Sequence, residues 1–524
     1  MRHIAQCATF MAAALLATVA LADVKPNHLF SDHMVLQRGV AVPVWGTASP
    51  GEQVTVTFGD QKQSAIAADN GKWMIRLASL QTGGPAEMTI AGKNSITIHD
   101  VLVGEVWIGS GQSNMQFPFA AAPNGGAYNG VKNVEQELPA ANYPLLRMYT
   151  VKTKLSAEPV DDTDGQWDVC TPDSAKTFSA IGYFFSRDLL QEINVPVGFI
   201  HSSFGASTAE AWISKTAMDG DPRLSGLMKN FQTSVTAFAA RKAATPAAAA
   251  APTPTPAPAA PPATLPTTQG ARGRGARAAR GGARGPRSPY TDQHNPTVLW
   301  NGMLNPLVPY AFCGVIWYQG ESVLGGTAGD KLYPAVMETL LKSWRAAWGE
   351  GDFPFYVCQL AGQDTGSNNP IIRESQAAIL TLPNTGMAVT IDIGEQHNVH
   401  PKNKQDVGDR LSRIALAKVY GQPIEYSGPV YDSMSVQGNS IRIKFTHADG
   451  LTARGGPLKT FVIAGADGKF VPATATIDGN SVVVLSPDVP NPANVRYAWM
   501  NWAEGCNLYN SASLPAAPFR TDRD

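Results

Sequence analysis

The chain has 524 residues, of which 44% are hydrophobic, and its formal net charge at pH 7 is −1. A chain of this length can bury a large core and is expected to form more than one domain. The near-zero charge excludes binding to nucleic acid or to an anionic membrane surface through a strongly basic overall field.

The N-terminus has the pattern of a secretory signal peptide over residues 1–22. Arg2 precedes an apolar run over residues 10–22, which ends in small residues of the kind found at a cleavage site. A membrane-spanning helix needs about 20 apolar residues, which is longer than this run. An uncleaved anchor is the alternative. We therefore expect a secreted or periplasmic protein with no integral membrane segment after cleavage.

Cleavage after residue 22 leaves four cysteines, Cys170, Cys313, Cys358 and Cys506. An even number of cysteines in an exported chain permits disulfides. Cys313 and Cys358 lie in or beside apolar runs, however, and buried free thiols are the alternative there. The wide spacings do not suggest a zinc site, and no metal or other cofactor is expected.

Hydrophobic periodicity divides the rest of the chain into three domains. Residues 23–100 and 426–524 alternate apolar and polar positions between tight turns, which predicts a β-sandwich at each end. Within residues 101–425, short apolar runs alternate with amphipathic stretches, which predicts an α/β domain with a parallel sheet covered on both faces. The expected strands lie near 101–108, 195–200, 314–318, 355–360 and 387–391, and the expected helices near 181–193, 333–348 and 403–419.

One segment departs from this pattern. Residues from about 239 to about 289 are rich in Ala and Pro, then in Gly and Arg, and contain no aromatic residue and no carboxylate. Such a composition cannot bury enough apolar area to offset the entropy of ordering, so we predict a disordered insert within the α/β domain. It is interpreted as a solvated linker, and attachment of its basic half to an anionic polymer is the alternative.

Polar residues follow four of the expected strands at their carboxyl ends, where parallel sheets bind ligands. The first strand runs into a glycine-rich turn that holds Ser113, and the others into residues 201–208, 319–322 and 392–400. These segments contain the parts of acyl transfer: a serine, histidines, carboxylates and backbone donors at glycines. The turn does not match Gly-x-Ser-x-Gly, and a serine that merely caps a helix is the structural alternative.

Four separated blocks resemble the sialate O-acetylesterase family, including related bacterial acetylxylan esterases. They are Gly-Gln-Ser-Asn-Met at 111–115, residues 203–212, Trp-Tyr-Gln-Gly-Glu-Ser at 317–322 and His-Pro-Lys-Asn-Lys at 400–404. The resemblance extends from about residue 27 to about residue 415, interrupted by the insert. It implies an SGNH hydrolase, which has a flavodoxin-like sheet.

The resemblance also implies a role for individual residues. Ser113 matches the nucleophile and His400 the base. The N–H groups of Ser113 and Gly205 match oxyanion donors, and the Gln319 amide stands where many SGNH enzymes use an asparagine. Glu321 is expected to anchor the Gln319 loop by an internal hydrogen bond, and direct catalysis is the alternative.

The expected triad also needs an acid. SGNH enzymes commonly place an aspartate three residues before the histidine, and that position is His397 here; the position two before is Asn398. Glu395 is the preferred choice to orient His400, and Asp392 is the alternative. A Ser–His pair without a close carboxylate is a third possibility and should be slower.

The sequence therefore predicts a serine esterase that releases acetate from O-acetylated carbohydrate through an acetyl-enzyme. It does not choose between sialic acid, xylan and other acetylated glycans, and esters of other short acyl groups remain open. The principal alternative is a non-catalytic protein that binds carbohydrate or acts as a surface scaffold, because two β-sandwiches flanking a central domain would suit either purpose.

Overall fold

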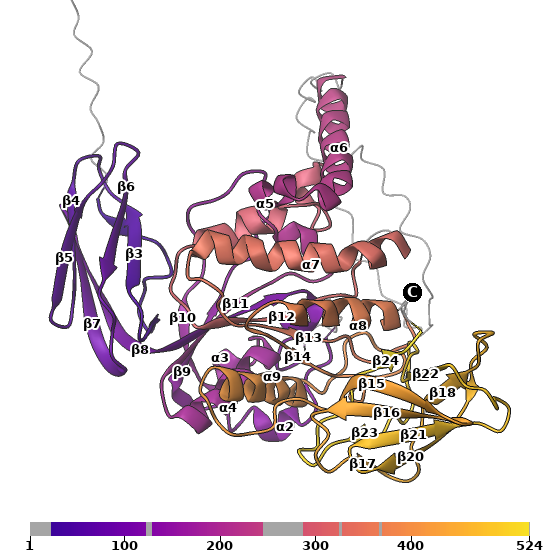
Figure 1. Cartoon of the computed structure of the whole chain (residues 1–524). Helices are drawn as coiled ribbons and strands as arrows, with labels where there is room; N and C mark the ends of the chain where they lie inside the picture. Colours follow the sequence, from indigo (N-terminus) through magenta and orange to yellow (C-terminus); the bar gives the residue numbers. More distant parts are fainter. Residues whose placement is uncertain (1–22, 122–127, 245–286, 324–326, 366–368, 523–524) are drawn as a thin grey trace, which may run out of the picture.

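Figure 1 shows the computed structural model of the chain, which describes residues 23–121, 128–244, 287–323, 327–365 and 369–522. The predicted signal peptide and nearly all of the predicted insert lie outside these ranges. A β-rich region at each end of the chain flanks a central α/β region (Figure 1). No helix within the described ranges is long and apolar enough to cross a membrane.

The N-terminal region consists of two sheets around one core. Alternating residues are buried along its strands, such as Val54 and Val56 in one sheet and Trp73 and Ile75 in the other, which confirms the predicted period of two. The first sheet contains β1 (Lys25–Pro26), β3 (Val42–Thr47) and β6 (Lys72–Leu77). The second contains β2 (Val35–Gln37), β4 (Gln53–Phe58), β5 (Gln61–Ile66), β7 (Gly83–Ala91) and the first half of β8 (Ser95–Gly111).

Strand β8 joins this region to the central sheet without a break. Its first half pairs with β7, and its second half pairs with β11 (Val197–Ser203) and β12 (Gly314–Tyr318). From Val101 onward every residue of β8 is buried, whereas burial alternates before that point. The boundary predicted at residue 100 therefore marks the change in burial pattern and falls inside a continuous strand.

The central sheet has the order β10-β9-β11-β8-β12-β13-β14. The strands β13 (Phe355–Cys358) and β14 (Thr385–Ala388) join β8, β11 and β12 in parallel pairing, as predicted. The strand β9 (Tyr143–Thr150), which the sequence analysis did not identify, pairs in parallel with β11. The edge strand β10 (Trp167–Cys170) is antiparallel to β9, so the sheet is mixed and not wholly parallel. The order β11-β8-β12-β13-β14 corresponds to 2-1-3-4-5, the order of flavodoxin-like sheets.

Helices cover both faces of this sheet, as the sequence predicts. Helices α4 (Ala180–Ile193) and α9 (Gln405–Lys418) pack together on one face, and α7 (Thr327–Trp348) and α8 (Asn369–Ala377) cover the other (Figure 1). Helix α6 (Ser225–Ala244) projects from the α7 side. The predicted start of the insert, near residue 239, is therefore wrong by one helical turn or more, because the alanines and basic residues at 239–244 are strong helix formers and continue α6.

The C-terminal region has two four-stranded sheets whose apolar residues share one core that also includes Val389 and Ile391 from the central region. A two-stranded ribbon of β17 (Thr452–Ala453) and β23 (Leu508–Tyr509) completes it. The first sheet contains β15 (Val430–Gln437), β16 (Ser440–Thr446), β20 (Thr474–Asp478) and β21 (Ser481–Leu485), and the second β18 (Phe461–Ala464), β19 (Val471–Pro472), β22 (Asn494–Tyr497) and β24 (Phe519–Arg520).

All four cysteines within the described ranges carry free thiols, and Cys170, Cys358 and Cys506 are buried. Burial raises the pKa of the Cys170, Cys358 and Cys506 thiols to about 12, so they remain protonated and unreactive at neutral pH. The sequence left disulfides and free thiols as alternatives, and the structure shows free thiols.

Candidate active site

Ser113 lies immediately beyond the carboxyl end of β8, where it begins the short helix α1 (Ser113–Gln116). The turn before it is held against β12, because the Gln112 N–H donates to the Tyr318 carbonyl at 2.9 Å. Gly111 has a φ of +132°, and a Cβ atom at this position would lie 2.1 Å from the Tyr318 oxygen. Only glycine fits there, and its tight approach to β12 fixes the direction in which Ser113 leaves the sheet.

The backbone of Gly205 lies over Ser113. A Cβ atom built on Gly205 would be 3.8 Å from the Ser113 Cβ. The Gly205 N–H donates to Gln116 Oε1 at 2.9 Å, and the Tyr128 hydroxyl donates to the same oxygen at 3.3 Å. The predicted oxyanion donor is therefore beside Ser113, but the Gln116 side chain occupies its single hydrogen bond.

Gln319 has a different role from the one predicted. Its side chain is fully buried and donates to the Ser207 carbonyl at 3.2 Å, while its Oε1 accepts from the Tyr333 hydroxyl at 2.7 Å. An amide that is turned inward cannot reach a substrate carbonyl. The structure therefore corrects the prediction of Gln319 as an oxyanion donor: the residue joins the loops after β11 and β12.

His400 lies in the loop between β14 and α9, with its ring against the ring of Tyr128. The two ring centroids are 5.2 Å apart and the ring planes are inclined by 57°. The His400 N–H donates to Asn398 Oδ1 at 3.0 Å, and the Asn398 amide donates back to the His400 carbonyl at 2.9 Å. Asn398 thus fixes the backbone N–H and the backbone carbonyl of the histidine.

Glu395 holds the same loop from the other side. Its Oε1 accepts from the Lys402 N–H at 2.7 Å and its Oε2 accepts from the Asn398 amide at 2.9 Å. The carboxylate therefore binds both Asn398, two positions before His400, and Lys402, two positions after it. Glu395 therefore holds the loop on which His400 lies.

The turn with Ser113 and the loop with His400 are joined directly. The Asn114 Nδ2 donates to the Val399 carbonyl at 3.0 Å, so the residue after the serine contacts the residue before the histidine. Tyr128 adds a second connection, because its ring contacts His400 and its hydroxyl contacts Gln116 in the serine helix. These contacts place the segments that carry Ser113, Gly205 and His400 next to one another at the carboxyl edge of the sheet.

Asp392, the alternative acid, is used elsewhere. Its two oxygens accept a bidentate pair of hydrogen bonds from Arg410 at 2.7 and 2.8 Å, and Tyr509 of the C-terminal region donates to it at 3.0 Å. Arg410 and Tyr509 are both buried, and the carboxylate links α9 to the β-rich C-terminal region. Asp392 therefore forms a structural ion pair with Arg410, which corrects the prediction that it could be the acid of the triad.

Two residues within the motif blocks received no role in the sequence analysis. Lys404 is buried, and its Nζ donates to Asn114 Oδ1 at 2.6 Å. Asn114 Nδ2 in turn donates to Glu321 Oε1. Glu321, predicted to anchor the Gln319 loop by an internal hydrogen bond, thus ties that loop to the Ser113 turn. In the sequence, this arrangement is indicated by the positions of Asn114 and Lys404 within the motif blocks at 111–115 and 400–404.

A second Ser–His pair lies inside strand β11. His201 Nε2 and Ser203 Oγ are 2.5 Å apart, and both side chains are buried. Burial lowers the pKa of His201 to about 4, so the ring stays neutral at physiological pH. Because both side chains are buried away from solvent, the pair is an internal contact of the strand.

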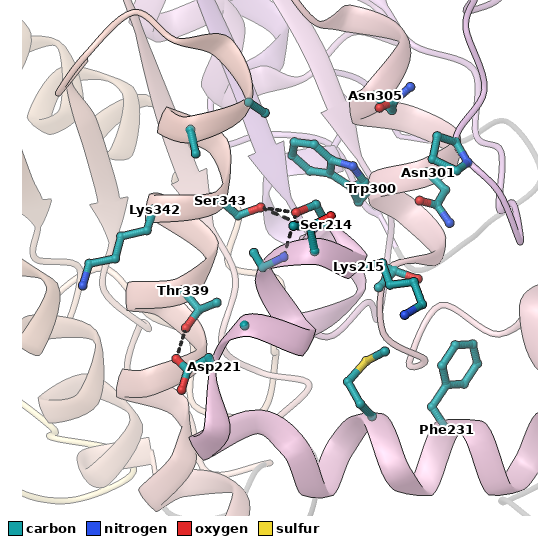
Figure 2. A pocket seen from close by; sticks show the side chains of 18 of the residues that line it. Ser214, Lys215, Asp221, Phe231, Trp300, Asn301, Asn305, Thr339, Lys342 and Ser343 are labelled. Carbon is teal, nitrogen blue, oxygen red and sulfur yellow. Dashed lines mark hydrogen bonds between the residues drawn. The ribbon is translucent and has the colours of Figure 1, made fainter.

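A cavity of about 970 Å³ lies beyond α7, between that helix, α5 (Lys215–Gly220) and α6 (Figure 2). Hydrogen bonds from Thr339 to Asp221 at 2.6 Å and from Ser343 to Ser214 at 2.9 Å cross its wall. None of Ser113, Gly205 and His400 lines it. The cavity is therefore separate from the residues of the predicted chemistry.

Comparison with known proteins finds similar chains among carbohydrate esterases. The profile of the family described as "Carbohydrate esterase, sialic acid-specific acetylesterase" matches residues 301–417, which include His400. The sialate O-acetylesterase of Pongo abelii is 28% identical over 94% of this chain and 92% of its own length. The human sialate O-acetylesterase is 26% identical over 93% of this chain and 91% of its own length.

A solved structure is similar over the whole chain. The crystal structure of a carbohydrate acetylesterase from Xanthomonas citri has 33% sequence identity and a TM-score of 0.77, and the match covers 96% of this chain and 100% of that one. Both β-rich regions and the central sheet are thus included in the similarity. This chain belongs to the sialate O-acetylesterase family of carbohydrate esterases.

Proposed function

We propose that this protein is a serine esterase that removes O-acetyl groups from carbohydrate, with Ser113 as nucleophile and His400 as base. The observation that carries the proposal is the Asn114–Val399 hydrogen bond, because it joins the two segments on which these residues lie. The family relatives support the substrate class, since they are named as acetylesterases of sialate and carbohydrate. The order of the central strands supports placement among the SGNH hydrolases.

The reaction proceeds in two steps. His400 accepts the Ser113 hydroxyl proton while Oγ forms a bond to the acetyl carbonyl carbon. The carbon–oxygen bond to the sugar then breaks, and the sugar oxygen leaves with the proton from His400. In the second step His400 takes a proton from water, and the resulting hydroxide attacks the acetyl-enzyme. The bond to Oγ breaks as His400 returns the proton to Ser113, and acetic acid leaves and ionises to acetate in solvent. No step calls for a cofactor.

Backbone amides stabilise the negative charge that develops on the carbonyl oxygen. The N–H groups of Ser113 and Gly205 are the proposed donors, and each contributes about 3 kcal/mol to the transition state. For Gly205 this requires that the substrate oxygen replace Gln116 Oε1 as the acceptor. Glu395 keeps the His400 loop in place through its bonds to Lys402 and Asn398.

Release of acetate from defined substrates tests the proposal. Acetylated xylan and O-acetylated sialic acid are compared with 4-nitrophenyl acetate, using the wild type, Ser113→Ala and Ser203→Ala. We expect kcat to fall by a factor on the order of 10⁴ or more in Ser113→Ala, because the nucleophile is lost. Ser203→Ala should retain the wild-type rate, since Ser203 is an internal partner of His201.

The carbohydrate that releases acetate fastest identifies the preferred class of substrate. Full activity of Ser113→Ala would refute the proposed nucleophile. Failure of the wild type to release acetate from any of the three esters would favour a non-catalytic carbohydrate-binding protein. Secretion or periplasmic location is a further part of the proposal, and fractionation of cells that express the full chain tests it.

A further inference from the structure

A chain of three polar side chains lies directly behind the Ser113 turn. Lys404 Nζ donates to Asn114 Oδ1 at 2.6 Å, and Asn114 Nδ2 donates both to Glu321 Oε1 and, at 3.0 Å, to the Val399 carbonyl. Asn114 and Lys404 are each 1% exposed. The second oxygen of Glu321 is also buried, with no hydrogen-bond partner among the residues that the structure describes. We call these three residues the Lys404–Asn114–Glu321 cluster.

We infer that the Lys404–Asn114–Glu321 cluster is a positioning device that sets the separation of Ser113 and His400. The inference rests on the proposed function, in which those two residues exchange a proton. A side-chain amide has one carbonyl oxygen and two N–H groups to donate, and all of them are used in Asn114. A cation at its oxygen and a carboxylate at its nitrogen allow only one orientation, and that orientation aims the remaining N–H at Val399.

Packing alone does not require the two charged groups. Burying a lysine and a glutamate removes both from water, and well-packed apolar side chains of similar size are often as stabilising or more so. The lysine ammonium lies over the rings of Phe117 and Tyr318, with Nζ 4.6 and 5.8 Å from the ring centroids. These contacts partly compensate the cation for its lost hydration. The cluster therefore orients the Asn114 amide at the active site, while its two charged groups lose part of their hydration.

The cluster should also respond to pH. The groups that face Lys404 are Tyr318 on β12, Glu321 in the loop after β12, Cys358 on β13 and Glu395 in the loop after β14. Burial lowers the pKa of Lys404 to about 7, and burial raises the pKa of Glu321. Loss of the Lys404 proton weakens its bond to Asn114, so we expect kcat to decline on the alkaline side of neutrality.

The first experiment separates positioning from stability. Lys404→Met/Glu321→Gln removes both charges together, and Lys418→Met is the matched control at the other end of α9. For each protein we measure kcat and KM with 4-nitrophenyl acetate, the rate at which a fluorophosphonate labels Ser113, and Tm. We expect the double variant to keep a Tm close to that of the wild type while kcat and the labelling rate fall about 100-fold, the loss that a displacement near 1 Å can cause.

KM should change little in the double variant, and Lys418→Met should keep the wild-type kcat. A double variant with unchanged kcat would overturn the inference. So would a lower Tm with an unchanged kcat per folded molecule, since the cluster would then be structural only. These outcomes differ from failure of the proposed function, which appears as an inactive wild type or an active Ser113→Ala.

The second variant, Glu321→Gln, keeps an oxygen for Asn114 and is the milder change. The Glu321 charge raises the pKa of Lys404, so its removal should shift the alkaline decline of kcat toward lower pH. A purely structural role would leave the position of this decline unchanged. A pH profile of Glu321→Gln that coincides with that of the wild type would therefore contradict the inference.

Discussion

The Asn114 side chain donates a hydrogen bond to the Val399 carbonyl at 3.0 Å across 285 positions of sequence. Asn114 follows Ser113 and Val399 precedes His400, so this bond spans the two segments that carry the proposed chemistry. The contact exists because β8 and β14 are parallel strands of one sheet and end at the same edge. Substitution of residues that hold these two segments therefore tests the proposed site.

Replacement of Gln116 by glutamate tests the oxyanion donor. Gln116→Glu places a negative charge on the oxygen that accepts from Gly205, beside the position where the substrate oxygen becomes negative. We expect kcat to fall about 10- to 100-fold with little change in KM, because the effect is confined to the transition state. Gln116→Met, which has similar size and no charge, should be faster than Gln116→Glu. Equal rates for the two variants would show that the Gly205 N–H is not a donor.

Substitution of Glu395 distinguishes loop positioning from direct contact with the histidine ring. Glu395→Gln keeps the shape of the side chain but weakens its bonds to the Lys402 N–H and the Asn398 amide. We expect a decrease of about tenfold in kcat for acetate release, because charge-assisted hydrogen bonds are replaced by neutral ones. A decrease near 10⁴-fold would instead show that Glu395 orients the ring itself, as an acid in a triad does.

Asp392 should matter for stability and not for chemistry. Asp392→Asn leaves Arg410 without its bidentate carboxylate and weakens the contact with Tyr509. We expect the free energy of unfolding in urea to fall by about 3 kcal/mol, because a buried guanidinium loses its counter-charge. The kcat of the folded protein should be unchanged. Asp409→Asn, which breaks the partly exposed pair with Arg413, should cost less than about 0.5 kcal/mol.

Glu210 gives a pH dependence of stability with a defined sign. Burial raises its pKa from 4.5 to about 7, so between these values the folded protein holds a proton that the unfolded chain has lost. The stability contributed by this proton is present below pH 4.5 and is lost as pH rises through about 7. Glu210→Gln is neutral at every pH and should therefore be more stable than the wild type at about pH 8, by about 3 kcal/mol at most.

Urea unfolding of both proteins at about pH 4.5 and about pH 8 measures this difference, which should vanish at the lower pH. The exposed Glu192 on α4 supplies the control, since Glu192→Gln makes the same change in net charge. Its effect should stay within about 0.5 kcal/mol at both pH values. A Glu210→Gln protein with the wild-type stability at about pH 8 would show that Glu210 is ionised without penalty in the folded state.

The central architecture could be read from the sequence because it depends on local periodicity. The apolar run at 314–318 forms β12, and the helical spacing of apolar residues from Tyr333 to Trp348 forms most of α7. The position of Ser113 after a buried strand was likewise visible, since Gly111 marks a turn that only glycine can make. Family resemblance added His400 and its proposed role as the base, which no local pattern could assign.

Hydrogen-bond partners could not be read in this way, because they depend on which loops meet. The amide of Gln319 has the right chemistry for an oxyanion donor, but Tyr333 and Ser207 hold it in the interior. Asp392 has the right chemistry for a triad acid, but Arg410 and Tyr509 bind both of its oxygens. Residue type therefore indicated the reaction, while the surroundings decided which residue is free to take part.

The sequence by itself determined the α/β centre, the flanking β-rich regions and the turn that presents Ser113, because strand and helix periods and glycine stereochemistry are local properties. Only the tertiary structure decided that Asn114 joins Glu321, Lys404 and Val399, and that Gln116 covers the Gly205 N–H. Those contacts connect segments about 90 to 290 residues apart, and their geometry is fixed by how the strands are ordered in the sheet.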